Sequence, residues 1–284
     1  MTRSLYDEVA EQTASIVIRR YSTSFGLASR LLGVGVRQHV ENIYALVRVA
    51  DEIVDGSGDA AGLSVLETGQ TLNALEQETE LAIELGFSAN LVVHAFALTA
   101  RESGFGSELT RPFFESMRMD LTETEHDQKS FERYVYGSAE VVGLMCLRSF
   151  VINEQVDDDA ALERGARALG AAFQKVNFLR DLAADFDALG RSYFPGVRVE
   201  SFDEQTKLRL LDDIDADLAV SASVLPLLPP SSRRAVALAQ FLFAELSRRL
   251  RATPADRLRT TRVRVPNPVK ARLALRAASG RLPQ

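Results

Sequence analysis

Two groups of acidic residues, each repeating at intervals of four, are the side chains of this sequence best suited to chemistry. The first group, Asp51 and Asp55, falls at the end of a stretch with helical periodicity. At that spacing both carboxylates project from the same face of a helix, about one turn apart, and repel each other. They also lie at the negative end of the helix dipole. A divalent cation between them would reverse both penalties, so the pair predicts a metal site.

A second group of oxygen-bearing side chains forms a ladder along another helical stretch. Asn177, Asp181 and Asp185 follow one another at four-residue intervals, with Gln174 and Arg180 beside them. Oxygen ligands favour Mg²⁺, with Mn²⁺ as the alternative ion, over zinc or copper. A rigid helix that offers few ligands leaves room for waters and substrate phosphate to complete the shell of Mg²⁺. The ladder therefore predicts a second metal site.

A solvated acidic helix face is the alternative explanation for each group, and for a single pair it is the more common one. The setting argues against it here, because the first pair ends an apolar stretch. The second ladder is flanked by Phe173, Val176, Leu179 and Leu182. Buried carboxylates require a counter-ion. Two such groups with nearby arginines favour metal-assisted chemistry, although spacing by itself does not name the reaction.

The elements that must position these residues are helices. Apolar residues recur at the i, i+3, i+4, i+7 spacing of a buried helix face in the stretches 38–54, 63–85, 89–99, 109–121, 131–151, 160–189, 204–224, 232–250 and 268–278. Glycine and proline clusters at 56–58, 104–106 and 226–230 separate them. No alternating strand pattern and no long linker is present. The sequence predicts one all-α domain over residues 1–284.

Composition narrows the classes of function. The 284 residues are 46% hydrophobic and 25% charged, which is typical of a folded globular protein, and the net charge of -6 argues against a nucleic-acid partner. An anionic substrate would need a local positive site or a bound cation. One cysteine and three scattered histidines exclude a disulfide framework and a zinc motif. With no signal peptide and no apolar run of ~20 residues, a cytoplasmic protein is expected.

Four segments, taken in order, carry a resemblance to a known family. They are residues 21–25, residues 44–55, residues 117–121 with 134–143, and residues 174–185 followed by 190–195. In this order they resemble the squalene and phytoene synthases, the head-to-head (1–1′) prenyl transferases, and most closely the bacterial phytoene synthases. The resemblance implies an isoprenoid-synthase-type helical bundle with a central apolar cavity.

The resemblance also implies a role for individual residues. The Mg²⁺ ligands would be Asp51, Asp55, Asn177, Asp181 and Asp185. The diphosphate oxygens would be bound by Arg48, Arg180 and Arg191, whose planar forks each fit two acceptors. Hydrogen bonds near the reacting ends would come from Ser22, Ser24, Tyr44, Tyr134 and Gln174. The hydrocarbon tunnel would be shaped by Phe25, Gly137, Ser138, Ala139 and Gly143.

The reaction that the resemblance implies is the Mg²⁺-dependent joining of two geranylgeranyl diphosphates to phytoene, early in carotenoid biosynthesis, through a cyclopropyl diphosphate and without NADPH. The alternative in the same family is dehydrosqualene or squalene synthesis from farnesyl diphosphate. A terpene cyclase or head-to-tail elongase is a further rival, but neither acidic group contains adjacent aspartates. A non-catalytic prenyl-lipid-binding protein would gain nothing from burying four carboxylates. A downstream desaturase is a candidate partner, and the sequence predicts no oligomeric state.

Several residues depart from the family pattern or extend it. Glu140 stands where a small residue is usual, and a carboxylate facing the tunnel would need a partner. Phe243 stands where the family often has a tyrosine. Asp120 and Arg118 are either groups that position the metal- and substrate-binding residues or a plain i, i+2 pair on different faces of a helix.

A basic run follows near the C-terminus, with Asp256 as its only acid: Arg248, Arg249, Arg251, Arg257, Arg259, Arg262 and Arg264. Helix-end charge and a solvated tail explain such a run. The alternative is peripheral contact with an anionic membrane, at the inner face of the cell membrane, where each basic residue adds ~1 kcal/mol.

Overall fold

Helices make up all the regular structure in the part of the chain that is described. The computed structural model describes residues 4–22, 24–189, 192–198 and 201–283, and for residues 24, 59 and 183–189 it describes the backbone alone. Within these residues no strand forms, and one isolated bridge joins Glu125 to Ser192. The prediction of an all-α fold is confirmed.

The elements are α1 (Leu5–Tyr21), α2 (Ser24–Ser29), α3 (Val34–Asp55), α4 (Ser57–Ala60), α5 (Val65–Leu85), α6 (Leu91–Ser103), α7 (Ser107–Thr122), α8 (Gln128–Val135), the π-helix η1 (Tyr136–Glu140), α9 (Val141–Phe150), α10 (Asp159–Leu189), α11 (Glu204–Val224), the 3₁₀-helix η3 (Leu225–Leu227), α12 (Pro230–Ala252), α13 (Ala255–Leu258) and α14 (Asn267–Ala278). Most bounds lie within a few residues of the predicted stretches, because apolar periodicity and breaker residues both act locally. The sequence interpretation missed α1, whose capping box at Ser4 and Asp7 marks its start.

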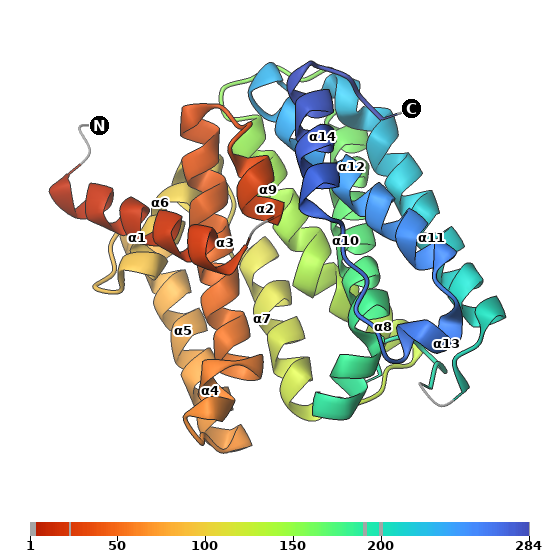
Figure 1. Cartoon of the computed structure of the whole chain (residues 1–284). Coiled ribbons are helices and arrows are strands. Elements are labelled where there is room, and N and C mark those ends of the chain that lie inside the picture. Colours follow the sequence, from red (N-terminus) through yellow and green to blue (C-terminus); the bar gives the residue numbers. More distant parts are fainter. Residues whose placement is uncertain (1–3, 23, 190–191, 199–200, 284) are drawn as a thin grey trace.

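The two acidic groups lie at the same end of the bundle. In Figure 1, α3 and α10 both run from the upper to the lower end of the molecule, so the C-terminal halves of both helices lie at the lower end. Helix α10 packs against α9, η1, α11 and α12, and α3 packs against α7 and α9. The irregular segment between α13 and α14 passes in front of α10 on its way up (Figure 1).

The stretch predicted as one helix over residues 131–151 is divided by the π-helix η1. Gly137 shows the local reason, since a Cβ at this position would overlap the carbonyl oxygen of Pro112 and the hydroxyl of Ser116 in α7. A π-turn widens the helix at a point where another helix comes close, and such turns are frequent at functional sites. The predicted helix is therefore confirmed as one continuous helical run, with a wider π-turn at its centre.

Candidate functional site

The first acidic pair ends α3, and an arginine one turn earlier compensates its charge. Arg48 Nη1 lies 2.7 Å from Asp51 Oδ2, and Arg48 Nη2 donates to Glu52 Oε1. Glu52 also accepts hydrogen bonds from the hydroxyl and the backbone N–H of Ser57. The Ser57 hydroxyl, and after it Arg48, holds the pKa of Glu52 below its ordinary value. The repulsion argued from spacing is thus relieved in part by a guanidinium.

Residues from the junction of α1 and α2 gather around Arg48. Its guanidinium carbon lies 4.4 Å from the centroid of the Tyr21 ring. Phe25 stacks on Tyr44 with ring centroids 5.9 Å apart, and the backbone N–H of Phe25 donates to Ser22 Oγ. Burial raises the pKa of the Tyr44 phenol, so the phenol is a neutral hydrogen-bond donor at physiological pH. The structure therefore brings these predicted substrate-binding residues together.

In the second acidic group, two arginines contact the carboxylate of Asp181. Arg180 Nε donates to Asp181 Oδ1 at 2.9 Å, and Arg262 Nε lies 2.7 Å from the same oxygen. Arg262 Nη2 also donates to Asp181 Oδ2 at 3.1 Å. Burial alone would raise the pKa of Asp181, but Arg180 and then Arg262 hold it below its ordinary value. Asp181 is therefore an ionised carboxylate that is paired with two guanidinium groups.

The other predicted residues of α10 are described only in part. Gln174 and Asn177 are half-buried on α10, within two turns before Asp181. Three predicted site positions lie outside the described residues, namely the side chains of Ser24 and Asp185 and the whole of Arg191.

Tyr134 lies between the two acidic groups. Its hydroxyl donates to both carboxylate oxygens of Asp120, each at 2.9 Å, and its ring centroid lies 5.8 Å from that of Phe178 on α10. Burial, and then the charge of Asp120, raises the pKa of Tyr134 well above its ordinary value. The charge of Asp55 acts on the same phenol in the same direction. Tyr134 therefore contacts Phe178 on α10, and the charge of Asp55 on α3 acts on its phenol.

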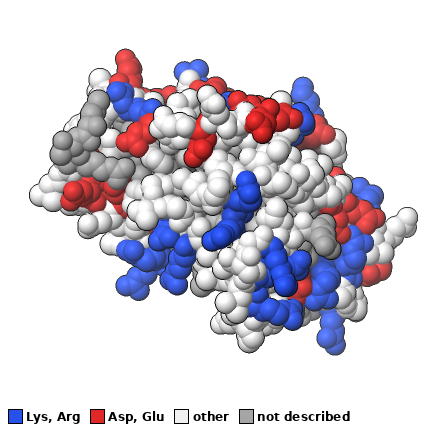
Figure 2. Space-filling model, turned by 90° about the horizontal axis from the view of Figure 1, so that it is seen from above, with Lys and Arg blue, Asp and Glu red and all other residues white. Residues whose placement is uncertain are grey.

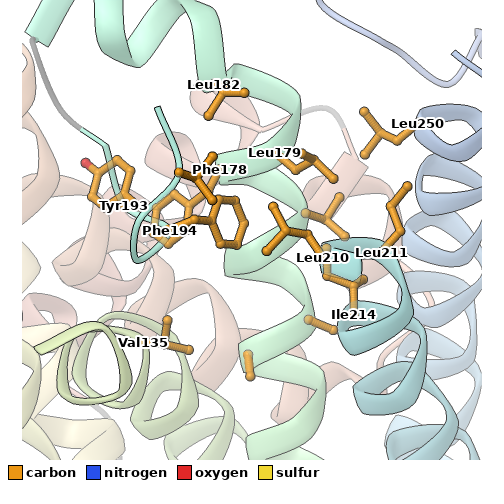
Figure 3. Close-up of a cluster of buried hydrophobic side chains, with 14 of the residues drawn as sticks. Val135, Phe178, Leu179, Leu182, Tyr193, Phe194, Leu210, Leu211, Ile214 and Leu250 are labelled. Carbon is orange, nitrogen blue, oxygen red and sulfur yellow. The ribbon is translucent and has the colours of Figure 1, made fainter. Parts of the chain in front are cut away.

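The aromatic wall behind Tyr134 is continuous with the core of the bundle. Figure 3 shows Phe178 beside Tyr193 and Phe194, with Leu179 and the leucines of α11 filling the opposite face of α10. The rings of Phe178 and Tyr193 are stacked with centroids 4.0 Å apart. This packing excludes water from one side of the phenol.

The small residues predicted to shape a tunnel serve helix packing in part. A Cβ on Gly143 would lie 2.5 Å from the carbonyl oxygen of Ala166, and a Cβ on Gly170 would lie equally close to that of Ala139. The missing side chain of Gly143 therefore makes room for the backbone of α10 rather than for a hydrocarbon chain. Gly137 packs on α7 in the same way. Helix packing by itself accounts for these two glycines, and a role of theirs in shaping a tunnel stays a prediction.

Two buried polar atoms among the described residues lack a hydrogen-bond partner, and both belong to predicted substrate-binding residues. They are Ser138 Oγ on η1 and Arg48 Nε on α3. Buried donors in native proteins are normally hydrogen-bonded, so these two atoms are candidates for contact with a bound ligand. These two atoms are suited to an oxygen-rich ligand.

The donor set fits Mg²⁺ shared with a substrate better than a metal held by protein alone. Among the described side chains, no three or more Asp, Glu, His or Cys residues form a metal-ligating group. Asp51 and Asp181 each have a carboxylate that forms an ion pair with an arginine. One or two carboxylates completed by phosphate oxygens and waters is the usual arrangement for Mg²⁺.

The departures from the family pattern have structural explanations. Glu140 pairs with Arg167 at 2.6 Å, which provides the partner that a carboxylate at this position needs. Arg167 also lies over the ring of Tyr136. Phe243 stacks on Phe173 with centroids 3.7 Å apart, so its ring serves packing between α12 and α10.

Sequence reasoning missed some residues of the site. It assigned Arg262 only to the basic run, and it did not consider Glu52. It treated Asp120 and Arg118 alike, yet Arg118 forms an ion pair with Glu76 at the surface. A periodic pattern cannot reveal Arg262, because this residue lies 81 positions from Asp181 in the chain.

Comparison with known proteins adds an independent line of evidence. The model of the family described as squalene/phytoene synthase matches residues 18–268. A 15-cis-phytoene synthase from Paracoccus sp. is 27% identical over 84% of this chain and 81% of its own length. A 15-cis-phytoene synthase from Pantoea ananas is 33% identical over 63% of this chain and 57% of its own length.

Solved structures agree on the architecture. A crystal structure of a dehydrosqualene synthase in complex with ligand superposes with a TM-score of 0.77, covering 96% of this chain and 97% of that chain at 23% identity. At this identity the similarity concerns the fold.

Proposed function

This chain belongs to the squalene/phytoene synthase family, and from that premise we propose that it joins two geranylgeranyl diphosphates head to head to give phytoene. It is an enzyme of the prenyltransferase type. Head-to-head prenyl condensation is the reaction class that the family supports, with prenyl diphosphates as substrates. The proposed reaction passes through a cyclopropylcarbinyl diphosphate and ends with loss of a proton.

One observation carries this proposal: each acidic group at the lower end of the bundle is held by guanidinium groups. Arg48 pairs with Asp51, while Arg180 and Arg262 pair with Asp181. A diphosphate with its cations brings both signs of charge. It can offer cations to these carboxylates and oxygens to these arginines at the same time. A site with alternating carboxylates and arginines is matched to such a ligand and would be costly to maintain without one.

The residues proposed to hold Mg²⁺ are Asp51, Asp55, Asn177, Asp181 and Asp185, with Mn²⁺ as an alternative. When bound, the ion would neutralise the diphosphate charge and favour its departure. Arg48 and Arg180 would bind the diphosphate oxygens in forked hydrogen bonds, and Arg191 is proposed for the same task. Ser138 Oγ and Arg48 Nε, which have no partner in the described structure, would gain one.

The apolar surroundings suit a carbocation reaction. A cation formed on the allylic carbon reacts with any water that reaches it, so the site must remain dry. Tyr134, Phe178 and Tyr193 provide a buried aromatic wall beside α10, the helix that carries Arg180. Phe25, Tyr44 and the η1 residues would border the prenyl chains on the other side, with Gln174 and Ser22 donating near the reacting ends.

The length of the prenyl chains is the finer part of the proposal. The sequence relatives named as 15-cis-phytoene synthases support geranylgeranyl diphosphate over farnesyl diphosphate. No NADPH is needed, because proton loss, and not reduction, ends the proposed reaction.

The decisive experiment is incubation of the purified protein with Mg²⁺ and either geranylgeranyl or farnesyl diphosphate, with and without NADPH, followed by mass spectrometry of the hydrocarbon. From geranylgeranyl diphosphate we expect a C40 hydrocarbon that contains a conjugated triene. Its formation should not depend on NADPH and should stop when the metal is chelated. A C30 product alone, formed from farnesyl diphosphate, would show that farnesyl diphosphate and not geranylgeranyl diphosphate is the substrate. No hydrocarbon from either substrate would overturn the enzymatic proposal.

We also propose a peripheral contact with anionic membrane. No helix among the described residues is long and apolar enough to cross a bilayer. Figure 2 shows basic side chains gathered mostly along the lower edge of one face and acidic side chains mostly along the upper edge. The chain beyond Asp256 contains basic residues and no acid. An anionic surface that receives a lipophilic product would attract this part of the molecule, and a membrane-bound desaturase is a candidate partner there.

A further inference from the structure

A buried carboxylate on α7 holds the hydroxyl of Tyr134. Asp120 is 6% exposed and Tyr134 is 3% exposed, and the phenol donates to both carboxylate oxygens at 2.9 Å. A second phenol, that of Tyr193, donates to Asp120 Oδ1 at 3.4 Å. Both phenols donate to the same buried side chain, so Asp120 restrains the position of both hydroxyls.

The surroundings of Tyr134 fix its ring as well as its hydroxyl. The imidazole of His126 lies with its centroid 5.2 Å from the Tyr134 ring and 5.9 Å from the Tyr193 ring. The chain that carries Tyr193 is attached to the segment that follows α7, because Ser192 N–H donates to the carbonyl of Thr124 at 2.8 Å. These contacts connect α7, α8 and the segment beyond α10 in one cluster.

The direction of the hydrogen bond has a chemical consequence. Because the phenol proton points at Asp120, the lone pairs of Tyr134 Oη point away from that carboxylate. A carboxylate behind a phenol also increases the negative charge on the phenol oxygen. A dipole fixed in this way stabilises a nearby cation without any need to reorganise when the cation forms.

We propose that Asp120 is a positioning residue for the condensation, which orients and polarises the Tyr134 hydroxyl so that its oxygen stabilises the allylic cation. This inference rests on the proposed function for the identity of the cation, but the arrangement of the two side chains does not depend on it. Asp120 itself does not touch the reacting atoms and acts through Tyr134. Tyr193 assists by sharing the carboxylate.

The kinetic test is a double-mutant cycle with Asp120→Asn and Tyr134→Phe. Asparagine keeps the size of the side chain and an acceptor oxygen but removes the charge. We expect Asp120→Asn to lower kcat by about tenfold or more and to change KM for the prenyl diphosphate by less than about twofold. In the Tyr134→Phe background, the same change should lower kcat by less than about twofold, because the group on which Asp120 acts is gone. Independent, multiplying effects of the two substitutions would overturn the proposal.

Thr99→Val is the matched control for a purely structural effect. Thr99 is a fully buried polar residue of α6, bonded to His39 and Asn42 in a cluster that contains no residue of the site. It should lower Tm while leaving kcat within about twofold of wild type. If Asp120→Asn lowers kcat no more than Thr99→Val does, Asp120 has no positioning role.

A readout without substrate separates this inference from the proposed function. Labelling the six tyrosines with 3-fluorotyrosine and recording ¹⁹F spectra identifies the Tyr134 resonance as the one lost in Tyr134→Phe. We expect Asp120→Asn to shift or broaden that resonance and that of Tyr193, while Thr99→Val leaves both unchanged. An unmoved Tyr134 resonance would overturn the inference even in an active enzyme. A missing hydrocarbon with a shifted resonance would overturn only the proposed function.

Discussion

At the scale of the residue, the main feature of the site is that its carboxylates already have counter-ions. Asp181 is held by Arg180 and Arg262, and Asp51 is held by Arg48. A partly buried carboxylate between two guanidinium groups keeps its charge over the whole physiological range, because its pKa is lowered. Such a group can exchange an arginine for a metal ion without a change in protonation.

Substitution of Asp181 by Asn should therefore impair turnover far more than folding. We expect Asp181→Asn to lower hydrocarbon formation by at least ~10²-fold, since it removes the charge of a proposed metal ligand and leaves Arg180 and Arg262 without their counter-ion. The measurement is product formation under saturating Mg²⁺, with circular dichroism to verify the fold.

Asp213→Asn is the matched control for this prediction. Asp213 pairs with Lys175 at the contact of α10 with α11 and lies at an exposed position. Its substitution should leave turnover within about twofold of wild type. Near-normal turnover of Asp181→Asn would remove this aspartate from the metal site.

At the scale of the element, glycines set the distance between α10 and the helix formed by η1 and α9. Gly170 faces the backbone of Ala139, and Gly143 faces the backbone of Ala166. Because the neighbouring atoms are backbone, they cannot turn aside as a flexible side chain would. This close contact places η1, with Ser138, against the helix that carries the second acidic group.

Gly170→Ala should consequently lower the free energy of unfolding by about 1–3 kcal/mol through overpacking. Chemical denaturation provides the measurement. Gly69→Ala on α5 is the control, since a Cβ there would make an ordinary contact with Leu121 at 3.7 Å. We expect this control to stabilise the protein by about 0.5–1 kcal/mol, as alanine does within a helix. A destabilisation by both substitutions would show that the helix spacing is not the cause.

Helix α1 is attached to α6 by a hydrogen bond between His94 and Asp7, and its contribution to stability should depend on pH. His94 Nε2 lies 2.9 Å from Asp7 Oδ1. The hydrogen bond to His94, followed by those to Ser4, lowers the pKa of Asp7 below 3.8. A carboxylate whose pKa is lowered by folding contributes stability above its unfolded pKa of about 3.9 and loses it as the pH falls through the folded pKa.

We therefore expect Asp7→Asn to lower the free energy of unfolding by up to about 1 kcal/mol at pH 7. The difference from wild type should shrink as the pH falls below 3.8. Glu8→Gln, an exposed change in the same turn, should have a much smaller effect at either pH. A constant difference across this range would exclude the carboxylate of Asp7 as the cause.

At the scale of the whole molecule, the first three arginines of the predicted basic run are paired with acids of the same chain. Arg248 and Arg249 pair with Glu245, and Arg251 pairs with Asp212 and Asp215. Arg251 thus joins α12 to α11, whereas Arg248 and Arg249 pair within α12. The charge proposed for a membrane lies further on, in the chain beyond Asp256 that includes α14.

Flotation with anionic vesicles checks this assignment. We expect retention at low salt that is lost at about 0.5 M salt, where the Debye length falls to a few ångströms. Arg272→Glu, at an exposed position of α14, should weaken retention, and Arg248→Ala should not, because Arg248 is paired with Glu245. No retention of the wild-type protein at low salt would leave the basic tail as a solvated segment.

The sequence alone determined what depends on local spacing. Periodicity predicted the helices, including α11 with both its bounds, and the intervals of four placed Asp51 with Asp55 and Asn177 with Asp181 on common faces. The order of the motifs also identified the family, which the family model supports over residues 18–268. These inferences succeed because a helix fixes the relative directions of residues three and four apart, whatever surrounds it.

Only the tertiary structure decided which distant residues meet these faces. Arg262 reaches Asp181 across 81 positions, Tyr193 reaches Asp120 across 73, and Glu140 finds Arg167 on the next long helix. The π-turn at η1 likewise depends on the approach of α7 to Gly137. Such contacts are set by how the helices pack. Asp181, proposed to bind a metal ion, and Arg262, which pairs with it, were therefore visible separately in the sequence, and only the fold brings them together.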